Sequence, residues 1–161
     1  MITEKLKVLF LDIDGVLNRF KYDEDGKPDN TLDEGCITRL DHIVRRTNCK
    51  IVISSTWKIS SHLMDILEED LFPKLPKGCV IGCTKTHIPQ VKREVEIQEW
   101  LDIHKDDIDN YVILDDYDFE LKSFINDGHC VITDALDGLT IKDMNECIRI
   151  LNTERKDNGQ T

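Results

Sequence analysis

Two pairs of aspartates follow segments with the composition of buried strands. Asp12 and Asp14 come directly after residues 7–11, and Asp115 and Asp116 come directly after residues 111–114. Side chains two positions apart on an extended segment face the same way, so we expect Asp12 and Asp14 to point to one side. Two carboxylates about 4 Å apart repel each other by about 4 kcal/mol at an effective dielectric constant near 20, which calls for a proton, a cation or solvent. Oxygen ligands in this number suit Mg²⁺.

A simple turn is the alternative interpretation of Asp-x-Asp-Gly, because both residue types favour turns. Two further observations favour a site. A second strand ends in acidic residues, and a third, over 50–53, ends in Ser54, Ser55 and Thr56.

These residue types suit phosphoryl transfer. With Mg²⁺ neutralising phosphate oxygens, Asp12 can attack phosphorus and form an aspartyl-phosphate. Asp14 can protonate the leaving oxygen and then activate water. Ser55 or Ser54, together with a cation, can hold the phosphoryl oxygens by hydrogen bonds.

Alternating strands and helices must position these residues. Apolar runs predict five strands, over 7–11, 50–53, 79–81, 111–114 and 129–132. Helical spacing of apolar residues predicts helices over 33–47, 59–71, 90–103, 118–125 and 141–151. This alternation is typical of an α/β fold with a parallel sheet, whose ligands bind at the carboxyl ends of the strands.

The aspartate and serine segments resemble the motifs of the haloacid dehalogenase (HAD) superfamily of phosphohydrolases. Its first motif is similar to residues 12–17, Asp-Ile-Asp-Gly-Val-Leu, its second to 51–55 and its fourth to 113–116. The resemblance implies a three-layer α/β sandwich with a Rossmannoid five-stranded sheet in the order 5-4-1-2-3.

A narrower resemblance covers nearly the whole chain. Residues 11–18, 53–58, 93–101, 114–116 and 133–140 look like the HAD domains of "Swiss Army Knife" RNA repair proteins. Those domains are proposed to remove phosphates from RNA ends. The chain has no room for ligase or kinase modules, so we expect one HAD-like hydrolase domain over 1–152 and a polar tail over 153–161.

The resemblance also implies roles for individual residues. Asp12 is the nucleophile and Asp14 the acid and base. Mg²⁺ is held by the Asp12 side chain, the Asp14 carbonyl and Asp115, with Asp116 binding directly or through water.

The third motif of the superfamily is a cation, for which Arg93 is our candidate and Lys92 and Lys85 are the alternatives. A cation at a helix N-terminus is locally unfavourable, which suggests another role for Arg93, although a surface ion pair with Glu94 or Glu96 is also open.

Substrate binding is expected from two further residues. Gly15 lets the backbone turn sharply after the first strand. Lys58 stands where related phosphatases carry an arginine that touches the substrate phosphate, although it can equally be a solvated residue at a helix start. Trp57 is expected to pack rather than to stack on a base.

A nearly capless core is expected, because residues 18–49 hold one loop and one helix, and residues 59–110 are needed by the sheet. We interpret 18–30 as a mobile flap. An open site accepts a macromolecular end more easily than it encloses a small metabolite, so the expected substrate is a phosphorylated macromolecule, namely RNA, DNA or a phosphoprotein.

Composition sets further limits. The chain has 161 residues and a formal net charge of -11, which argues against generic polyanion binding but leaves room for a short basic strip beside an acidic metal site. No apolar run approaches the ~20 residues of a membrane span. The N-terminus shows no signal peptide. We interpret the six cysteines as buried free thiols, which predicts a reducing, cytoplasmic location. The sequence leaves the oligomeric state open.

Two other function classes share part of this residue pattern. A receiver-like signalling module also phosphorylates an aspartate, but its acidic pair follows the first strand and its acceptor follows the third, unlike the order here. A non-catalytic binding protein of the same fold is the other, although every motif position is chemically competent.

Overall fold

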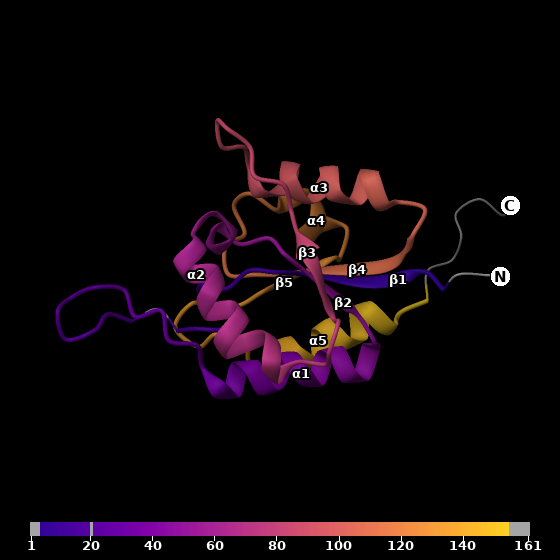
Figure 1. Ribbon diagram of the computed structural model, residues 1–161. Helices are drawn as coiled ribbons and strands as arrows, with labels where there is room; N and C mark the ends of the chain where they lie inside the picture. The colour runs from indigo at the N-terminus through magenta and orange to yellow at the C-terminus, as the bar shows by residue number, and fades with distance from the viewer. Residues whose placement is uncertain (1–3, 20, 155–161) are drawn as a thin grey trace, which may run out of the picture.

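Five strands form one parallel sheet in the order β3-β2-β1-β4-β5 in the computed structural model, which describes residues 4–19 and 21–154 (Figure 1). The strands are β1 (Leu6–Leu11), β2 (Lys50–Ile53), β3 (Val80–Cys83), β4 (Ile108–Asp115) and β5 (Cys130–Ile132). One face is covered by α3 (Arg93–His104) and α4 (Lys122–Asn126), and the other by α1 (Glu34–Thr47), α2 (Ser61–Ile66) and α5 (Ile141–Asn152). The expected three-layer fold and strand order are confirmed.

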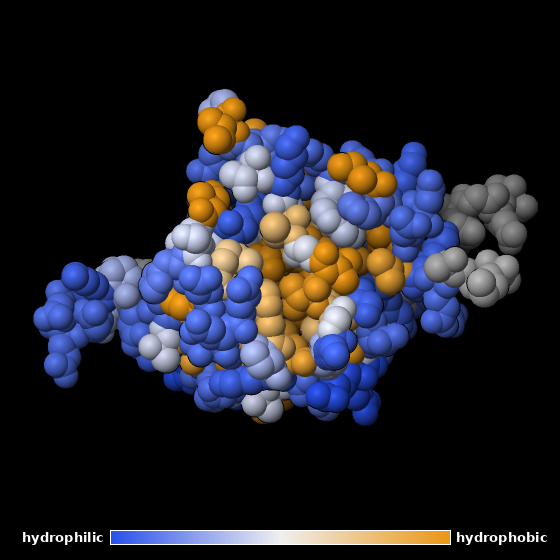
Figure 2. Space-filling view, viewed as in Figure 1, coloured by the Kyte–Doolittle hydropathy of each residue, from blue (hydrophilic) through white to orange (hydrophobic). Residues whose placement is uncertain are grey.

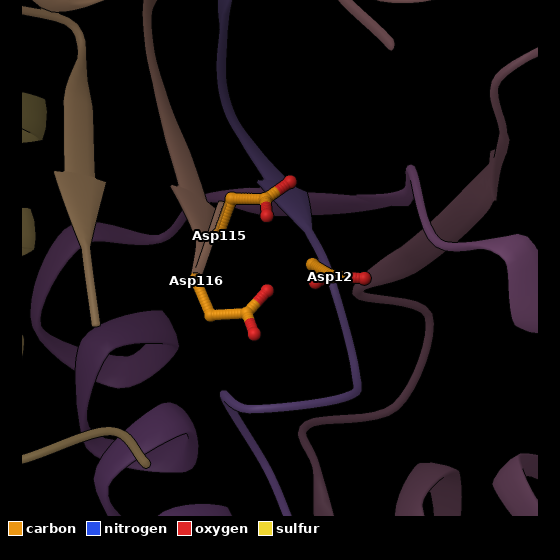
Figure 3. Close-up of side chains that lie close together, drawn as sticks. All are labelled: Asp12, Asp115 and Asp116. Carbon is orange, nitrogen blue, oxygen red and sulfur yellow. The ribbon is translucent and has the colours of Figure 1, made fainter. Parts of the chain in front are cut away.

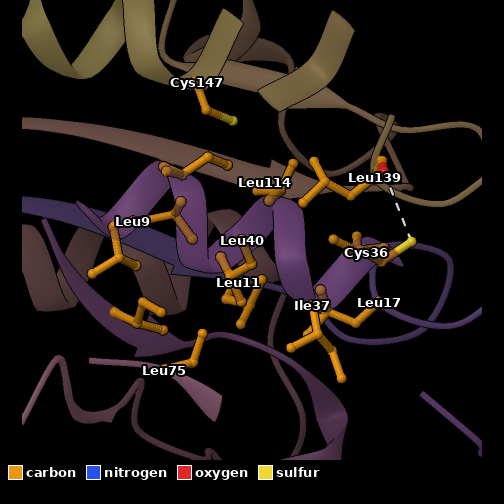
Figure 4. Packing of buried hydrophobic residues seen from close by; sticks show 14 of the residues in the cluster. Leu9, Leu11, Leu17, Cys36, Ile37, Leu40, Leu75, Leu114, Leu139 and Cys147 are labelled. Atoms are coloured by element: carbon orange, nitrogen blue, oxygen red, sulfur yellow. Dashed lines mark hydrogen bonds between the residues drawn. The ribbon is translucent and has the colours of Figure 1, made fainter. Parts of the chain in front are cut away.

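The central strand β1 divides the core into two layers. Val8 and Phe10 pack in the cluster beneath α3 and α4, whereas Leu9 and Leu11 pack in the cluster beneath α1 and α5, part of which Figure 4 shows. All four side chains are fully buried. Successive strand residues point to opposite faces, so a strand covered on both sides must be apolar throughout.

Side chains fix the ends of the long helices. The Asp33 carboxylate accepts a hydrogen bond from the Cys36 amide at 2.9 Å and caps the start of α1. The helix is followed by its C-cap Asn48 in the left-handed conformation. Thr140 and Asp143 form a reciprocal capping box at the start of α5. The helices expected over 33–47 and 141–151 are therefore confirmed within two residues.

Three predicted helices differ in extent. The helix expected over 59–71 is instead α2 followed by a π-helical turn (Leu67–Leu71), and a 3₁₀ turn (Thr56–Ile59) precedes them. The Ser60 side chain separates that turn from α2 by accepting from the Leu63 amide. The helix expected over 118–125 begins only at Lys122. The helix expected over 90–103 begins at Arg93.

The segment after β1 projects beyond the carboxyl ends of the strands (Figure 1), and Figure 2 shows that the projection is hydrophilic. Backbone hydrogen bonds link residues of this segment to one another. The Asp23 amide donates to the Lys27 carbonyl at 2.8 Å, and the Asp29 amide donates to the Lys21 carbonyl at 3.0 Å. No cap domain is present among residues 4–19 and 21–154, so the described core is nearly capless. The mobility expected for 18–30 stays a prediction.

At one side of the sheet, β3 is the edge strand, and apolar side chains gather there between α2 and α3 (Figure 2). Four cysteines are buried as expected, namely Cys36, Cys49, Cys79 and Cys147. The interpretation is wrong for Cys83, which is exposed because it lies on the edge strand, and Cys130 is half-buried.

The last helix ends close to the expected end of the domain. Helix α5 ends at Asn152, next to the limit expected for the domain, and residues 155–161 of the expected tail lie outside the described residues. Among the helices described, none is both long and apolar enough to cross a membrane.

Candidate active site

The acidic ends of β1 and β4 meet at the carboxyl edge of the sheet. Leu11 pairs with Leu114 in the parallel register of these strands, so the residues that follow are neighbours. Asp12, Asp115 and Asp116 each place a carboxylate oxygen within 4.8 Å of the others. Figure 3 shows the three side chains converging from the ends of the two strands. The expected convergence is therefore present for three of the four carboxylates.

The fourth carboxylate, of Asp14, is held differently. It is exposed, and its Oδ1 accepts a hydrogen bond from Asn18 Nδ2 at 3.0 Å. Asn18 Oδ1 also accepts from the Gly15 amide at 3.0 Å, so one buried amide side chain fixes this turn. The resemblance assigned the Asp14 carbonyl to Mg²⁺, which stays a prediction.

Burial and mutual repulsion make the carboxylate cluster electrostatically unfavourable by itself. Burial raises the pKa of Asp12 well above its ordinary value, and the charge of Asp115 raises it further, against the opposing effect of Arg93. Burial also raises the pKa of Asp116. A buried group resists ionisation unless a cation compensates its charge.

Arg93 supplies part of that compensation. Its Nη1 lies 2.6 Å from Asp115 Oδ2 and 3.4 Å from Asp12 Oδ2. Burial lowers the pKa of Arg93, but Asp12 and Asp115 outweigh burial and raise it above the ordinary value, so the guanidinium stays charged. The structure therefore brings Arg93 to the carboxylates, whereas Lys85 and Lys92 are exposed. Its catalytic role stays a prediction.

The remaining charge fits a divalent cation. If all three carboxylates were ionised, they and the one guanidinium would leave two negative charges in a largely buried space. The donors are carboxylate oxygens, which Mg²⁺ prefers. The residues present thus suit the metal that the fold family implies.

The two candidate serines, in the turn after β2, differ in their hydrogen bonding. Both are buried, and the Ser54 amide donates to the Leu11 carbonyl at 2.9 Å, which ties the turn to the end of β1. Ser55 Oγ accepts from the Trp57 amide at 3.2 Å and so caps the 3₁₀ turn. Ser54 Oγ has no hydrogen-bond partner within the described ranges. This geometry favours Ser54 as the hydroxyl available to a substrate.

Lys58 is buried, with only 4% of its side chain exposed. Its Nζ lies 2.7 Å from Thr84 Oγ1 and 2.5 Å from Glu96 Oε2. The idea of a solvated residue is therefore wrong, and contact with substrate phosphate stays a prediction. Trp57 is 1% exposed and packs in the core, as expected.

Gly15 lies against the acidic cluster. It has a φ of 76°, and a Cβ at this position would lie 2.2 Å from Asp116 Oδ2. The Gly15 carbonyl accepts from Thr133 Oγ1 at 2.7 Å, so the segment after β5 supports the same turn. The expected sharp turn is present, and substrate binding by Gly15 stays a prediction.

Sequence reasoning missed the aromatic residues at this edge. Tyr117 and Phe119 follow the acidic pair directly, and their side chains are exposed. The Tyr117 amide donates to Asp115 Oδ1 at 3.0 Å. Their position after an acidic strand end was a signal, but the predicted helix over 118–125 gave no reason to expect exposure.

Comparison with known proteins agrees with this geometry. Residues 8–144 match the family model described as the HAD domain in Swiss Army Knife RNA repair proteins. The chain therefore belongs to this family, its fold is of the HAD type, and the family match supports a phosphatase-like function. A search of curated proteins gives no match.

Proposed function

We propose that the chain is a Mg²⁺-dependent phosphomonoester hydrolase that forms an aspartyl-phosphate on Asp12. The observation that carries this proposal is the meeting of Asp12, Asp115 and Asp116 within 4.8 Å, with Arg93 hydrogen-bonded to Asp115. The cation would be held by the Asp12 and Asp115 carboxylates and the Asp14 carbonyl, with Asp116 binding directly or through water. When bound, Mg²⁺ would neutralise the charge of the carboxylates and of the phosphoryl oxygens.

In the first step, an Asp12 carboxylate oxygen attacks phosphorus while the bond from phosphorus to the ester oxygen breaks. Asp14 gives its proton to that leaving oxygen. In the second step, Asp14 takes a proton from water, whose oxygen attacks phosphorus. The bond to Asp12 breaks, so inorganic phosphate leaves and the Asp12 carboxylate is restored.

The surrounding residues suit these roles. The exposed Asp14 carboxylate is accessible to water, and Asn18 keeps it oriented. The Ser54 hydroxyl can donate to a phosphoryl oxygen, and the charged Arg93 can stabilise the negative charge of the transition state.

We propose a phosphorylated macromolecule as the substrate, in particular an RNA or DNA end. The nearly capless site leaves room for a chain, and the family name refers to RNA repair. A cytoplasmic location is proposed with it, supported by the buried cysteine thiols.

The test is hydrolysis of p-nitrophenyl phosphate by the parent protein and by Asp12→Asn. We expect the variant to lose at least about three orders of magnitude in kcat. Asp25→Asn, which removes an exposed acid from the projecting loop, is the matched control. Acid quenching with ³²P-labelled substrate should trap hydroxylamine-labile label on the parent protein only. Parental activity in Asp12→Asn would overturn the nucleophile assignment.

A further inference from the structure

The positive charge of this acidic chain is unevenly distributed. Residues 71–93 contain five lysines and arginines and no aspartate or glutamate, although the formal net charge of the chain is -11. The end of this stretch, residues 84–92, connects β3 to α3 and projects above the start of α3 in Figure 1. It carries the exposed residues Lys85 and Lys92, and we call it the basic loop.

A second segment at the same edge exposes aromatic rings. Tyr117 is 54% exposed and Phe119 is 64% exposed, with ring centroids 6.2 Å apart. Lys122 Nζ lies 5.1 Å from the centroid of the Phe119 ring. Neither ring belongs to the two core clusters, so packing of the described residues does not explain them. We call Tyr117 and Phe119 the aromatic pair.

Hydrogen bonds join the ends of both segments to the carboxylates. The Arg93 amide, directly after the basic loop, donates to Glu120 Oε2 at 3.2 Å, next to Phe119. The Arg93 guanidinium contacts Asp115, and the Tyr117 amide also donates to Asp115. The end of the basic loop, at Lys92, is therefore adjacent in the chain to a residue that contacts Asp115, and Tyr117 of the aromatic pair contacts Asp115 itself.

We propose that the aromatic pair and the basic loop bind the unpaired end of a nucleic-acid strand whose terminal phosphate enters the carboxylate site. An aromatic ring stacks on the base next to the reacting phosphate, and Lys85 and Lys92 contact phosphates of the adjoining backbone. This inference rests on the proposed phosphatase function and adds the means by which that site selects its substrate.

Two physical arguments favour a single strand over a phosphopeptide. Every unpaired base offers a π-face to an exposed ring, whereas a base inside a duplex is covered on both faces. The acidic surface elsewhere repels a polyanion, so binding is confined to a short footprint. Two phosphate contacts predict a salt dependence with a log–log slope of only about -1.4.

The test compares two oligonucleotides that end in the same phosphorylated sugar, one with its terminal base and one abasic. We expect the parent protein to prefer the base-containing oligonucleotide about tenfold in kcat/KM. Tyr117→Ala and Phe119→Ala should lower this ratio toward one, and Phe119→Trp should retain it. Because the result is a ratio, a general loss of activity cancels. Ile103→Ala, which removes an exposed apolar side chain at the far end of α3, is the control.

Binding provides a measurement that needs no catalysis. Fluorescence anisotropy of the labelled oligonucleotides with Asp12→Asn should show the same preference for the terminal base. In that background, Lys85→Gln with Lys92→Gln should reduce the salt slope toward zero, whereas Lys105→Gln should leave it unchanged.

The possible failures are distinguishable. Base-independent binding and hydrolysis would overturn this inference and leave the phosphatase proposal standing, as would a preference for phosphopeptides or blunt duplexes. Base-dependent binding without any phosphate release by the parent protein would overturn the phosphatase proposal alone.

Discussion

Lys58 Nζ lies 2.5 Å from Glu96 Oε2, and both side chains are almost completely buried. The pair joins the turn after β2 to the first turn of α3, three residues beyond Arg93. Thr84 Oγ1 accepts a further hydrogen bond from Lys58. The interaction therefore fixes the end of the helix that carries the candidate catalytic cation.

We expect Glu96→Leu and Lys58→Met each to lower the free energy of unfolding by about 3 kcal/mol, because each leaves a buried charge without its partner. The double variant should be less destabilised than the sum of the two, since it leaves neither charge. Denaturation in urea over this double-mutant cycle measures the difference. Strict additivity would show that the two side chains are not coupled.

Asp14→Asn should lower kcat by about 10² to 10⁴-fold, because both proposed steps need a proton transfer at this carboxylate. The slowing should depend on the leaving group, being smaller for p-nitrophenolate, which leaves without a proton, than for an alkoxide. Single-turnover rates with both kinds of ester measure this. An equal loss with the two esters would contradict the acid role.

Gly15→Ala should remove most of the activity and weaken Mg²⁺ binding, because the added Cβ would meet Asp116 Oδ2 at 2.2 Å. Gly26→Ala is a matched control. Gly26 has a φ of 77°, close to that of Gly15, but no atom lies within 4 Å of the added Cβ. Backbone strain of about 1 kcal/mol is then common to both variants. Calorimetric titration with Mg²⁺ should distinguish them, and equal affinities would show that strain alone is responsible.

Asp116→Asn should stabilise the protein in chelator and abolish its stabilisation by Mg²⁺. Removing one of three close carboxylates relieves repulsion, but it also removes a candidate metal ligand. For the parent protein, Mg²⁺ at about 100 times its Kd should raise the free energy of unfolding by about 2.7 kcal/mol. Scanning calorimetry with EDTA and with Mg²⁺ checks both signs, and a parent protein that does not respond to Mg²⁺ would contradict the metal site.

Asp33→Ala should cost about 1 kcal/mol of stability through loss of the α1 cap, whereas Asp33→Ser should retain most of it. Hydrogen bonding from the Cys36 amide lowers the pKa of Asp33. The ionised carboxylate therefore contributes stability that is complete above its unfolded pKa and is lost as pH falls through the lower folded value. Unfolding free energies of the parent protein and Asp33→Ser, measured between neutral and acidic pH, should converge in that window.

The fold was predictable because its strands are buried on both faces. Strand β1 must be apolar at every position from Val8 to Leu11, and the change to Asp12 marks its carboxyl end. Once β1 and β4 are known to be adjacent, the meeting of Asp12 with Asp115 and Asp116 follows from strand geometry. These parts of the site depend on local sequence and on one pairing.

The rest depended on contacts that sequence spacing does not reveal. Lys58 is paired because Glu96, 38 residues later, arrives from α3. The helix expected over 118–125 begins only at Lys122, and the Tyr117 amide turns back to Asp115, so Tyr117 and Phe119 lie before the helix with exposed side chains. The difference between Ser54 and Ser55 arises from a single bond to the Trp57 amide. Each of these features depends on a tertiary contact or a backbone hydrogen bond that the positions of the strands do not determine.

The projecting loop has a consequence for how this domain can diversify. Main-chain hydrogen bonds join Asp23 to Lys27 and Asp29 to Lys21, so these bonds form within the loop and do not involve the sheet. Insertions or deletions at its tip therefore leave the strand that carries Asp12 undisturbed. Evolution can exchange this loop for a longer arm and alter which molecules reach the edge of the sheet, while the chemistry of the aspartates is inherited unchanged.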